Sequence, residues 1–304
     1  MLHHRPLVAR RDWVSSNPES IPMILATGAN GMVGSYFPSE TVLKTDIPEM
    51  DVTDFDCVRD MFRQHRPDHV LHLAAWTDVD GAESHIEDCC RTNAIGTLHV
   101  AAAAREVGAI LTYISTTQVF NGKKDDPYTE FDEVDPVNAY GASKAEGEKI
   151  VREICDRHYI FRAGWMLGGG GKDHKFVGKM FDLMKTRDEL VAVDDKTGSP
   201  TYAKDLCDGI LAHIETGLFG TYHMVNGGGV CTRYSMAIEI AKILGRDDIT
   251  ISPVSSEVFP LPAKRGNNES AINHKLSLMG RNPMRPWREA LSDYVRAELM
   301  TCGR

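Results

Sequence analysis

Ile24-Leu-Ala-Thr-Gly-Ala-Asn-Gly-Met-Val-Gly34 is the stretch of sequence that decides the fold. A short apolar run typical of a buried strand is followed at once by Gly28, Gly31 and Gly34. Glycines at this spacing allow a tight turn, close approach of a pyrophosphate to backbone amides, and a following helix whose N-terminus favours negative charge. The spacing differs from the commoner G-x-G-x-x-G, and a glycine-rich surface turn is the alternative. The position directly after a strand favours a dinucleotide-binding turn.

Strand-like and helix-like segments alternate after this turn. Strands are expected over 41–44, 69–75, 109–115 and 159–162, and helices over 54–64, over 93–104 and around Tyr140. This alternation predicts an α/β fold with a Rossmann-type, doubly wound parallel sheet and right-handed crossovers. Ligands of such sheets bind beyond the carboxyl ends of the strands, where the sequence places Gly28, Ala74, Ala75 and Thr116.

We expect one nucleotide-binding domain and a smaller C-terminal substrate-binding lobe. The Rossmann domain is expected over 23–164, with 190–228 returning to it, and the lobe over 165–189 and 229–304. Residues 1–22 are expected to be an N-terminal extension without the apolar run of a signal peptide. The glycine-rich stretch 164–171 is expected to be a loop with Trp165 as an aromatic wall, and His72 to be a hydrogen-bonded core residue.

Composition excludes several classes of function. A net charge of −9 argues against a general nucleic-acid binder or a binder of anionic membranes, since no basic field is available. No stretch reaches the length of a membrane span. The seven cysteines form an odd set without a C-x-x-C pair, which indicates neither a disulfide framework nor a zinc site and favours a reduced, cytoplasmic setting.

Tyr140-Gly-Ala-Ser-Lys144 carries the most specific chemistry. The spacing places the Tyr140 and Lys144 side chains one turn apart on the same helix face. A lysine ammonium there is expected to lower the tyrosine pKa from its ordinary value near ~10, so that the phenol can act as a general acid. The preceding strand ends in polar residues whose hydroxyls could bond the group that the tyrosine protonates. The pattern indicates a carbonyl-reducing site, although a solvated helix face gives the same spacing.

Nine stretches, in this order, resemble the extended short-chain dehydrogenase/reductase superfamily and, within it, the dTDP-4-dehydrorhamnose reductase family. The resemblance runs from about Met23 to Tyr294. The stretches are Thr27-Gly-Ala-Asn-Gly-Met-Val-Gly34, Asp51-Val-Thr-Asp54, Leu73-Ala-Ala-Trp-Thr-Asp-Val-Asp80 with Glu83, Ile114-Ser-Thr116, Val119-Phe120, Pro127-Tyr-Thr-Glu130, Pro136-Val-Asn-Ala-Tyr-Gly-Ala-Ser-Lys144, Gly198-Ser-Pro-Thr201 and Trp287-Arg-Glu-Ala-Leu291.

The resemblance implies hydride transfer from NADPH or NADH to the C4 ketone of a nucleotide-linked 4-keto-6-deoxysugar, most closely dTDP-4-dehydro-L-rhamnose. It implies a catalytic set of Thr116, Tyr140 and Lys144, in which the phenol donates a proton to the developing alkoxide and the threonine bonds the same oxygen. The residues implied to contact the cofactor are Gly28, Asn30, Gly31, Met32, Gly34, Asp51, Val52, Ala74, Ala75, Thr77, Tyr140 and Lys144. Those implied to contact the substrate are Val119, Trp165 and Arg265.

Two departures from the family pattern leave the substrate open. Ser115-Thr-Thr-Gln-Val-Phe120 stands where the family usually shows Ser-Thr-Asp-Tyr-Val-Phe, so Thr117 and Gln118 replace an Asp and an active-site Tyr. The family's Arg-Pro-x-Asn-Ser-x-Leu stretch for the nucleotide end appears only as Arg265-Gly-Asn-Asn-Glu-Ser-Ala-Ile-Asn-His-Lys-Leu276. Thr117 and Gln118 cannot titrate, which argues against the acid–base pair of sugar-nucleotide 4,6-dehydratases.

Two further functions are consistent with the same residues. A nucleotide-sugar 4-epimerase uses the same triad, and the regulatory subunit of methionine adenosyltransferase resembles the family as a non-catalytic binding protein. Lys44 could pair with the 2'-phosphate of NADPH, whereas Asp46 could accept from a ribose hydroxyl of NADH. Some family members use Mg²⁺ at a dimer contact, so the ion and a homodimer are possible, although no metal ligand can be assigned from this sequence.

Overall fold

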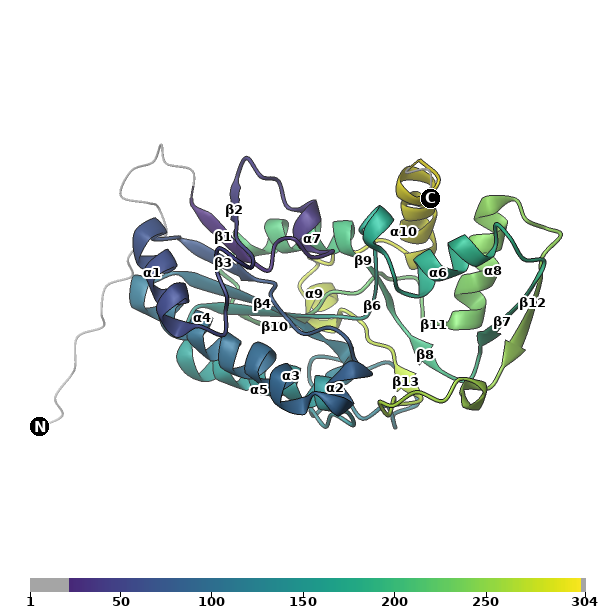
Figure 1. Cartoon of the computed structure of the whole chain (residues 1–304), viewed down its shortest axis with the longest axis horizontal. Coiled ribbons are helices and arrows are strands. Elements are labelled where there is room, and N and C mark those ends of the chain that lie inside the picture. Colours follow the sequence, from purple (N-terminus) through teal and green to yellow (C-terminus); the bar gives the residue numbers. More distant parts are fainter. Residues whose placement is uncertain (1–21, 302–304) are drawn as a thin grey trace, which may run out of the picture.

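The structure is a computed structural model that describes residues 22–301. Of the expected extension, residues 1–21 lie outside the described part. A six-stranded, all-parallel sheet forms the centre of the molecule, in the order β10-β5-β4-β3-β1-β2 (Figure 1). The strands are β1 (Ile24–Thr27), β2 (Val42–Lys44), β3 (His69–His72), β4 (Ile110–Thr116), β5 (His158–Ala163) and β10 (Gly220–His223). The predicted Rossmann-type α/β fold is confirmed.

The direction of winding reverses beside β1. The chain passes from β1 outward to β2 and then returns to β3 on the other side of β1, so that Leu25 pairs with both Leu43 and Val70. A reversal of this kind opens a crevice at the carboxyl ends of the strands. The glycine turn after β1 lies at that reversal.

Helices cover both faces of the sheet. The first face carries α1 (Phe55–His65), α4 (Gly96–Val107) and α5 (Ala139–Ile154), and the second carries α7 (Ala203–Ile214) and α9 (His274–Leu278). Asp54 before the helical pattern predicts a cap, and its side chain does cap α1 by accepting from the Cys57 N–H. Gly108 after the next helical pattern predicts the end of that helix, and with φ 76° it ends α4 in the left-handed conformation.

The helix expected after the glycine turn is only one turn long. η1 (Gly34–Tyr36) is a 3-10 segment, and Phe37 behind it is extended, with φ −75° and ψ 137°. Pro38 explains the difference, because a proline disfavours helical backbone in the residue before it. An anion at this turn would therefore meet backbone amides without the dipole of a long helix.

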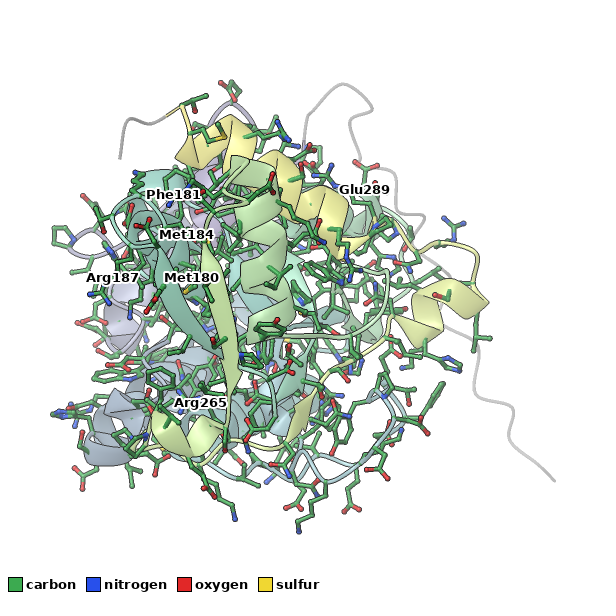
Figure 2. The ribbon with its side chains drawn as sticks, turned by 90° about the vertical axis from the view of Figure 1, so that its right-hand side faces the viewer. Met180, Phe181, Met184, Arg187, Arg265 and Glu289 are labelled. Atoms are coloured by element: carbon green, nitrogen blue, oxygen red, sulfur yellow. The ribbon has the colours of Figure 1, made fainter. Side chains whose placement is uncertain are left out.

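A second hydrophobic core lies beside the sheet. Its principal elements are β6 (Trp165–Leu167), α6 (Phe176–Leu183), β7 (Glu189–Val193), α8 (Arg233–Leu244), β12 (Thr250–Val254) and α10 (Trp287–Tyr294). Figure 2 looks onto this part and shows Met180, Phe181 and Met184 together beside the β7–β12 pair, with Arg265 below them. The short connecting elements are α2 (Gly81–Ser84), α3 (Ile86–Cys90), η2 (Arg91–Ile95), η3 (Thr117–Val119), η4 (Gly170–Lys172), β8 (Thr197–Gly198), β9 (Pro200–Tyr202), β11 (Cys231–Thr232), η5 (Ser256–Val258), β13 (Asn268–Glu269) and η6 (Val295–Leu299).

Segment 190–228 divides between the two cores. β10 pairs with β5 in the main sheet and α7 packs on that sheet, whereas β7 pairs with β12 outside it. Trp165, expected in a loop, lies in β6, where its N–H donates to the Ser199 carbonyl at 2.8 Å. The domain boundaries themselves stay a prediction. No helix within residues 22–301 is long and apolar enough to cross a membrane.

Candidate active site

One large cavity lies beyond the carboxyl ends of β1, β3 and β4. Its volume is about 1480 Å³, more than the ~300–1,000 Å³ typical of a pocket for one small ligand. The predicted site residues that line it are Gly28, Gly31, Met32, Gly34, Asp51, Val52, Ala74, Ala75, Thr77, Thr116, Tyr140, Lys144, Trp165 and Arg265. The structure therefore brings the glycine turn and the Tyr140 helix to one cavity, with room for a dinucleotide and a second ligand.

Two predicted site residues lie elsewhere. Val119 is fully buried against Phe120 and Tyr128, because the η3 turn directs its side chain into the core. Asn30 is exposed, donates its N–H to the Asp46 carboxylate at 2.8 Å and accepts from Lys172 Nζ at 3.1 Å. Neither Val119 nor Asn30 is among the described residues that line the cavity. The cavity does reach Asp46, and among the described residues Lys44 is not part of its lining.

Gly28 joins the ends of β1 and β3. Its φ of 62° is left-handed, and a Cβ built on it would lie 2.5 Å from the Cα of Ala74. Thr27 Oγ1 accepts from the Ala74 N–H at 3.2 Å, and this hydrogen bond also holds the end of β1 against the segment after β3. This close approach leaves the backbone of the turn open to the cavity, and the absence of a side chain there fits a dinucleotide pyrophosphate.

Gly28→Ala is therefore expected to weaken NAD(P)H binding by at least about tenfold, since the methyl group forces the β1 turn away from β3. Titration of nicotinamide fluorescence measures this loss. Gly171→Ala is the matched control, because no heavy atom lies within 4 Å of a Cβ built there and its φ is not left-handed. Equal cofactor affinity of the Gly28 and Gly171 variants would contradict the assignment of the turn.

His72 is the core histidine that the sequence predicts. Its Nδ1 lies 2.8 Å from Thr27 Oγ1 and its Nε2 lies 3.0 Å from Thr97 Oγ1. Burial, reinforced by the nearby Lys144 charge, lowers the pKa of His72 to about 3, so the ring is neutral at physiological pH. The imidazole thereby connects β1, β3 and α4 behind the cavity and is not free to act as a ligand.

The Tyr140 helix begins at a hydrogen-bonded cap. Asn138 Oδ1 accepts from the Gly141 N–H at 2.7 Å, and α5 then carries Tyr140 and Lys144 to the cavity. Only 3% of the Lys144 surface is exposed, and its Nζ lies 4.0 Å from the ring centroid of Tyr113. Helix α5 thus holds the Tyr140 phenol and the Lys144 amine in one wall of the cavity.

Burial governs the protonation of both groups. It raises the pKa of Tyr140 to about 12, although a hydrogen bond with Thr116 opposes the increase. It lowers the pKa of Lys144 to about 7, while the negative charge of Glu148 opposes the decrease. The expected lowering of the Tyr140 pKa is therefore wrong, because desolvation outweighs the hydrogen bond with Thr116. Tyr140 is consequently protonated at neutral pH, as a proton donor must be.

A buried ion pair supports this wall from behind. Glu148 accepts from Arg162 Nε at 2.8 Å and from Arg162 Nη2 at 2.7 Å, and the more exposed Arg152 adds a contact at 3.0 Å. Burial opposes ionisation of Glu148, but the Arg162 hydrogen bonds prevail and keep its pKa below the ordinary value. The carboxylate is therefore charged where it can stabilise the ammonium form of Lys144.

The cavity also contains a partly buried guanidinium that the sequence did not reveal. Arg233 lies 3.8 Å from the ring centroid of Trp165 and 5.0 Å from that of Phe176. Burial lowers the pKa of Arg233 to about 10, so it is still charged at neutral pH. Within residues 22–301 it has no ion-pair partner, and it lines the cavity together with Lys196.

Trp165 is fixed in position beside Arg233. Its Nε1 donates to the Glu269 carboxylate at 2.6 Å, and its ring packs on Gly198, where a Cβ would lie 2.3 Å away. Trp165 therefore lines the cavity as the predicted aromatic wall, but from strand β6 and not from a loop. Arg265 also lines the cavity, as predicted, but Asp80 Oδ1 and Oδ2 hold its guanidinium at 2.8 Å and 2.9 Å.

Arg233 was missed because the sequence pattern predicts a helix over 235–244, which leaves Arg233 outside it. The Thr232 side chain forms a capping box with Ser235, so α8 begins earlier and Arg233 occupies its first turn. The stretch Thr232-Arg-Tyr-Ser235 carries this capping pattern in the sequence, and it could have placed the start of the helix before Arg233. No sequence signal would have placed Arg233 on Trp165.

Metal ligands are not grouped in the described part of the chain. Within it, no cluster of three or more His, Cys, Asp or Glu side chains could hold a metal ion, so the structure gives no support for Mg²⁺. The cysteines of the described part, at 57, 89, 90, 155, 207 and 231, are all free thiols.

Known proteins resemble this chain in both sequence and fold. The family described as "RmlD substrate binding domain" matches residues 22–300. A dTDP-4-dehydrorhamnose reductase of Streptomyces griseus is 36% identical over 300 residues, which cover 95% of this chain and 97% of that protein. A crystal structure of a dTDP-4-dehydrorhamnose reductase from Clostridium acetobutylicum superposes with a TM-score of 0.86 at 38% identity, over 90% of this chain and 99% of that one. The Bacillus anthracis enzyme of the same name, solved in complex with NADP, gives a TM-score of 0.87 at 35% identity, over 91% of this chain and 100% of that one. The chain belongs to the dTDP-4-dehydrorhamnose reductase family of the extended short-chain dehydrogenase/reductase superfamily.

Proposed function

We propose that this chain reduces the C4 ketone of a dTDP-linked 4-keto-6-deoxysugar with NADPH or NADH, and that dTDP-4-dehydro-L-rhamnose is the substrate. As a member of its family the chain is an NAD(P)H-dependent oxidoreductase. The observation that carries the proposal is the presence of Thr116, Tyr140 and Lys144 on the cavity that the glycine turn also lines. Reduction of a ketone needs a proton donor beside a bound nicotinamide, and this cavity offers both positions.

Each catalytic side chain has a distinct task in this proposal. The bound cofactor supplies hydride to the carbonyl carbon. Tyr140, protonated at neutral pH, donates a proton to the oxygen that becomes negative. Thr116 Oγ1 accepts from the Gln118 N–H at 3.2 Å, and its hydrogen bond with Tyr140 keeps the two hydroxyls together, so that both can bind the same substrate oxygen. Lys144 has a pKa of about 7 and regains its charge readily, so that it stabilises the phenolate left on Tyr140.

The basic wall suits the diphosphate of a nucleotide sugar. The chain has a net charge of −9, so an anionic substrate depends on local capture. Arg233 offers a partly buried guanidinium without an ion-pair partner in residues 22–301, and a planar fork binds phosphate oxygens in pairs. Its contact with Trp165 supports a phosphate site next to the expected sugar site.

Arg233→Gln is expected to raise KM for the nucleotide sugar by about 10- to 100-fold while kcat and the Kd of NAD(P)H change little, because a charged hydrogen bond made in both ground and transition state is lost. Steady-state kinetics measure this split. Arg288→Gln is the matched control, since Arg288 also lies over a tryptophan ring, at 4.3 Å from Trp287, but its side chain is 54% exposed. A fall in kcat with an unchanged KM would contradict the phosphate assignment.

The decisive assay follows NAD(P)H absorbance with a panel of dTDP-linked 4-ketosugars. We expect consumption of one cofactor per sugar, fastest with dTDP-4-dehydro-L-rhamnose. Cofactor retained through purification, with no net oxidation, would favour the 4-epimerase. Absence of turnover with every ketosugar, alongside tight binding to a partner protein, would favour the regulatory role.

A further inference from the structure

Gln118 occupies a special place on the wall of the cavity. It follows Thr116 by two residues, in the 3-10 turn η3, and it lines the cavity with Thr116 and Tyr140. The family usually has a tyrosine at this position, so the side chain there differs in both size and hydrogen-bonding capacity. An amide presents one acceptor and two donor hydrogens, and which of them faces the cavity depends on its partners.

The neighbouring Asn138 settles the orientation of the Gln118 amide. Asn138 Oδ1 must accept, because its partner at 2.7 Å is the Gly141 N–H. Its Nδ2 therefore faces Gln118 and the Lys264 carbonyl, at 3.1 Å and 3.0 Å. Since Nδ2 only donates, the Gln118 atom that meets it is the acceptor Oε1.

This arrangement leaves the donor end of Gln118 available. Nε2 carries two hydrogens and has no protein partner within residues 22–301. Asn138 is 93% buried and fully engaged, so it resists the rotation that would exchange the two ends of the Gln118 amide. Since Gln118 also lines the cavity, its unpartnered amide is a neutral N–H donor that a substrate bound there can reach.

We infer that Gln118 is a specificity-determining residue, whose Nε2 donates to the hydroxyl on the carbon next to the reduced ketone. The inference rests on the proposed function, in which Thr116 and Tyr140 bind the C4 oxygen. In a 4-keto-6-deoxysugar the carbon on one side of C4 carries a methyl group and the carbon on the other side, C3, carries the hydroxyl. Gln118 thus selects nucleotide-linked 4-keto-6-deoxysugars that retain the C3 oxygen over their 3-deoxy counterparts.

The test compares 3-hydroxy and 3-deoxy dTDP-4-keto-6-deoxysugars as substrates of the full chain. We expect the parent to favour the 3-hydroxy sugar in kcat/KM by at least about tenfold, the effect of one lost hydrogen bond that leaves the Gln118 N–H donor unpaired. Gln118→Met should lower kcat/KM for the 3-hydroxy sugar by at least about tenfold. Its kcat/KM for the 3-deoxy sugar should stay within about twofold of the parent value, so that the preference for the 3-hydroxy sugar disappears. Gln64→Met, on the exposed face of α1, is the matched control.

Several outcomes would overturn the inference. Equal kcat/KM values of the parent for the two sugars would refute the selection of the C3 hydroxyl before any variant is made. Equal losses of kcat/KM on both sugars in Gln118→Met would show that Gln118 has only a structural role. Titration with NAD(P)H shows whether that variant retains the cofactor site. A parent that binds NAD(P)H but reduces neither sugar would refute the proposed function, which is a different result from reduction without preference.

Discussion

Tyr140→Phe is expected to lower kcat by about 10³-fold, within the range found for loss of a general acid, while the Kd of NAD(P)H stays within about twofold. The phenylalanine keeps the ring of Tyr140 on α5 and removes only the transferable proton. Because the ring packs the same wall, the fold and the cofactor crevice should be preserved. Single-turnover absorbance of NAD(P)H separates the chemical step from product release and measures the loss directly.

The control for this loss is Tyr234→Phe. Tyr234 lies in α8, is partly buried, and is not among the described residues that line the cavity. Its variant should turn over like the parent. If Tyr140→Phe did the same, the proton would come from another group, and the proposed role of Tyr140 would be lost.

Lys144→Met is expected to lower kcat/KM by about 10²- to 10³-fold, because the phenolate left on Tyr140 loses the adjacent positive charge. The methionine occupies similar space in a site where only 3% of the lysine surface is exposed, so the helix should remain in place. Lys149→Met, on the exposed face of the same helix, is the control. Equal activity of the Lys144 and Lys149 variants would contradict the role of the buried amine.

The same lysine should shape the pH dependence of stability. Its pKa falls from 10.5 to about 7 on folding, so between these values the unfolded state binds one more proton than the native state. The free energy of unfolding of the parent, measured against Lys144→Met, should therefore rise with pH from about 7 to about 10, with a slope on the order of 1 kcal/mol per pH unit. Urea titrations across this range measure the difference, and a flat difference would show that Lys144 is not desolvated.

Local signals in the sequence predicted the features that local interactions determine. The cap at Asp54, the left-handed Gly108 and the pairing of Tyr140 with Lys144 on α5 each follow from residues within one or two turns. His72 could be identified as a core residue because apolar neighbours surround it in the sequence. These elements also locate the cavity, since parallel strands end at a common edge.

Features set by tertiary packing could not be predicted in this way. Burial, and not the spacing to Lys144, controls the pKa of Tyr140. Arg233 meets Trp165, and Asp80 engages Arg265, across large separations in the sequence. Pro38 was visible in the sequence, and its effect on the preceding residue could have shortened the expected helix after the glycine turn.

Transfer of deuterium from the cofactor to the sugar tests the central claim most directly. The parent is incubated with NAD(P)H deuterated at both C4 positions of the nicotinamide and with dTDP-4-dehydro-L-rhamnose, and the product is examined by mass spectrometry and NMR. We predict one deuterium at C4 of the product for each cofactor oxidised. Recovery of the unchanged ketosugar with no cofactor oxidised, or a reduced sugar without deuterium at C4, would contradict hydride transfer to that ketone.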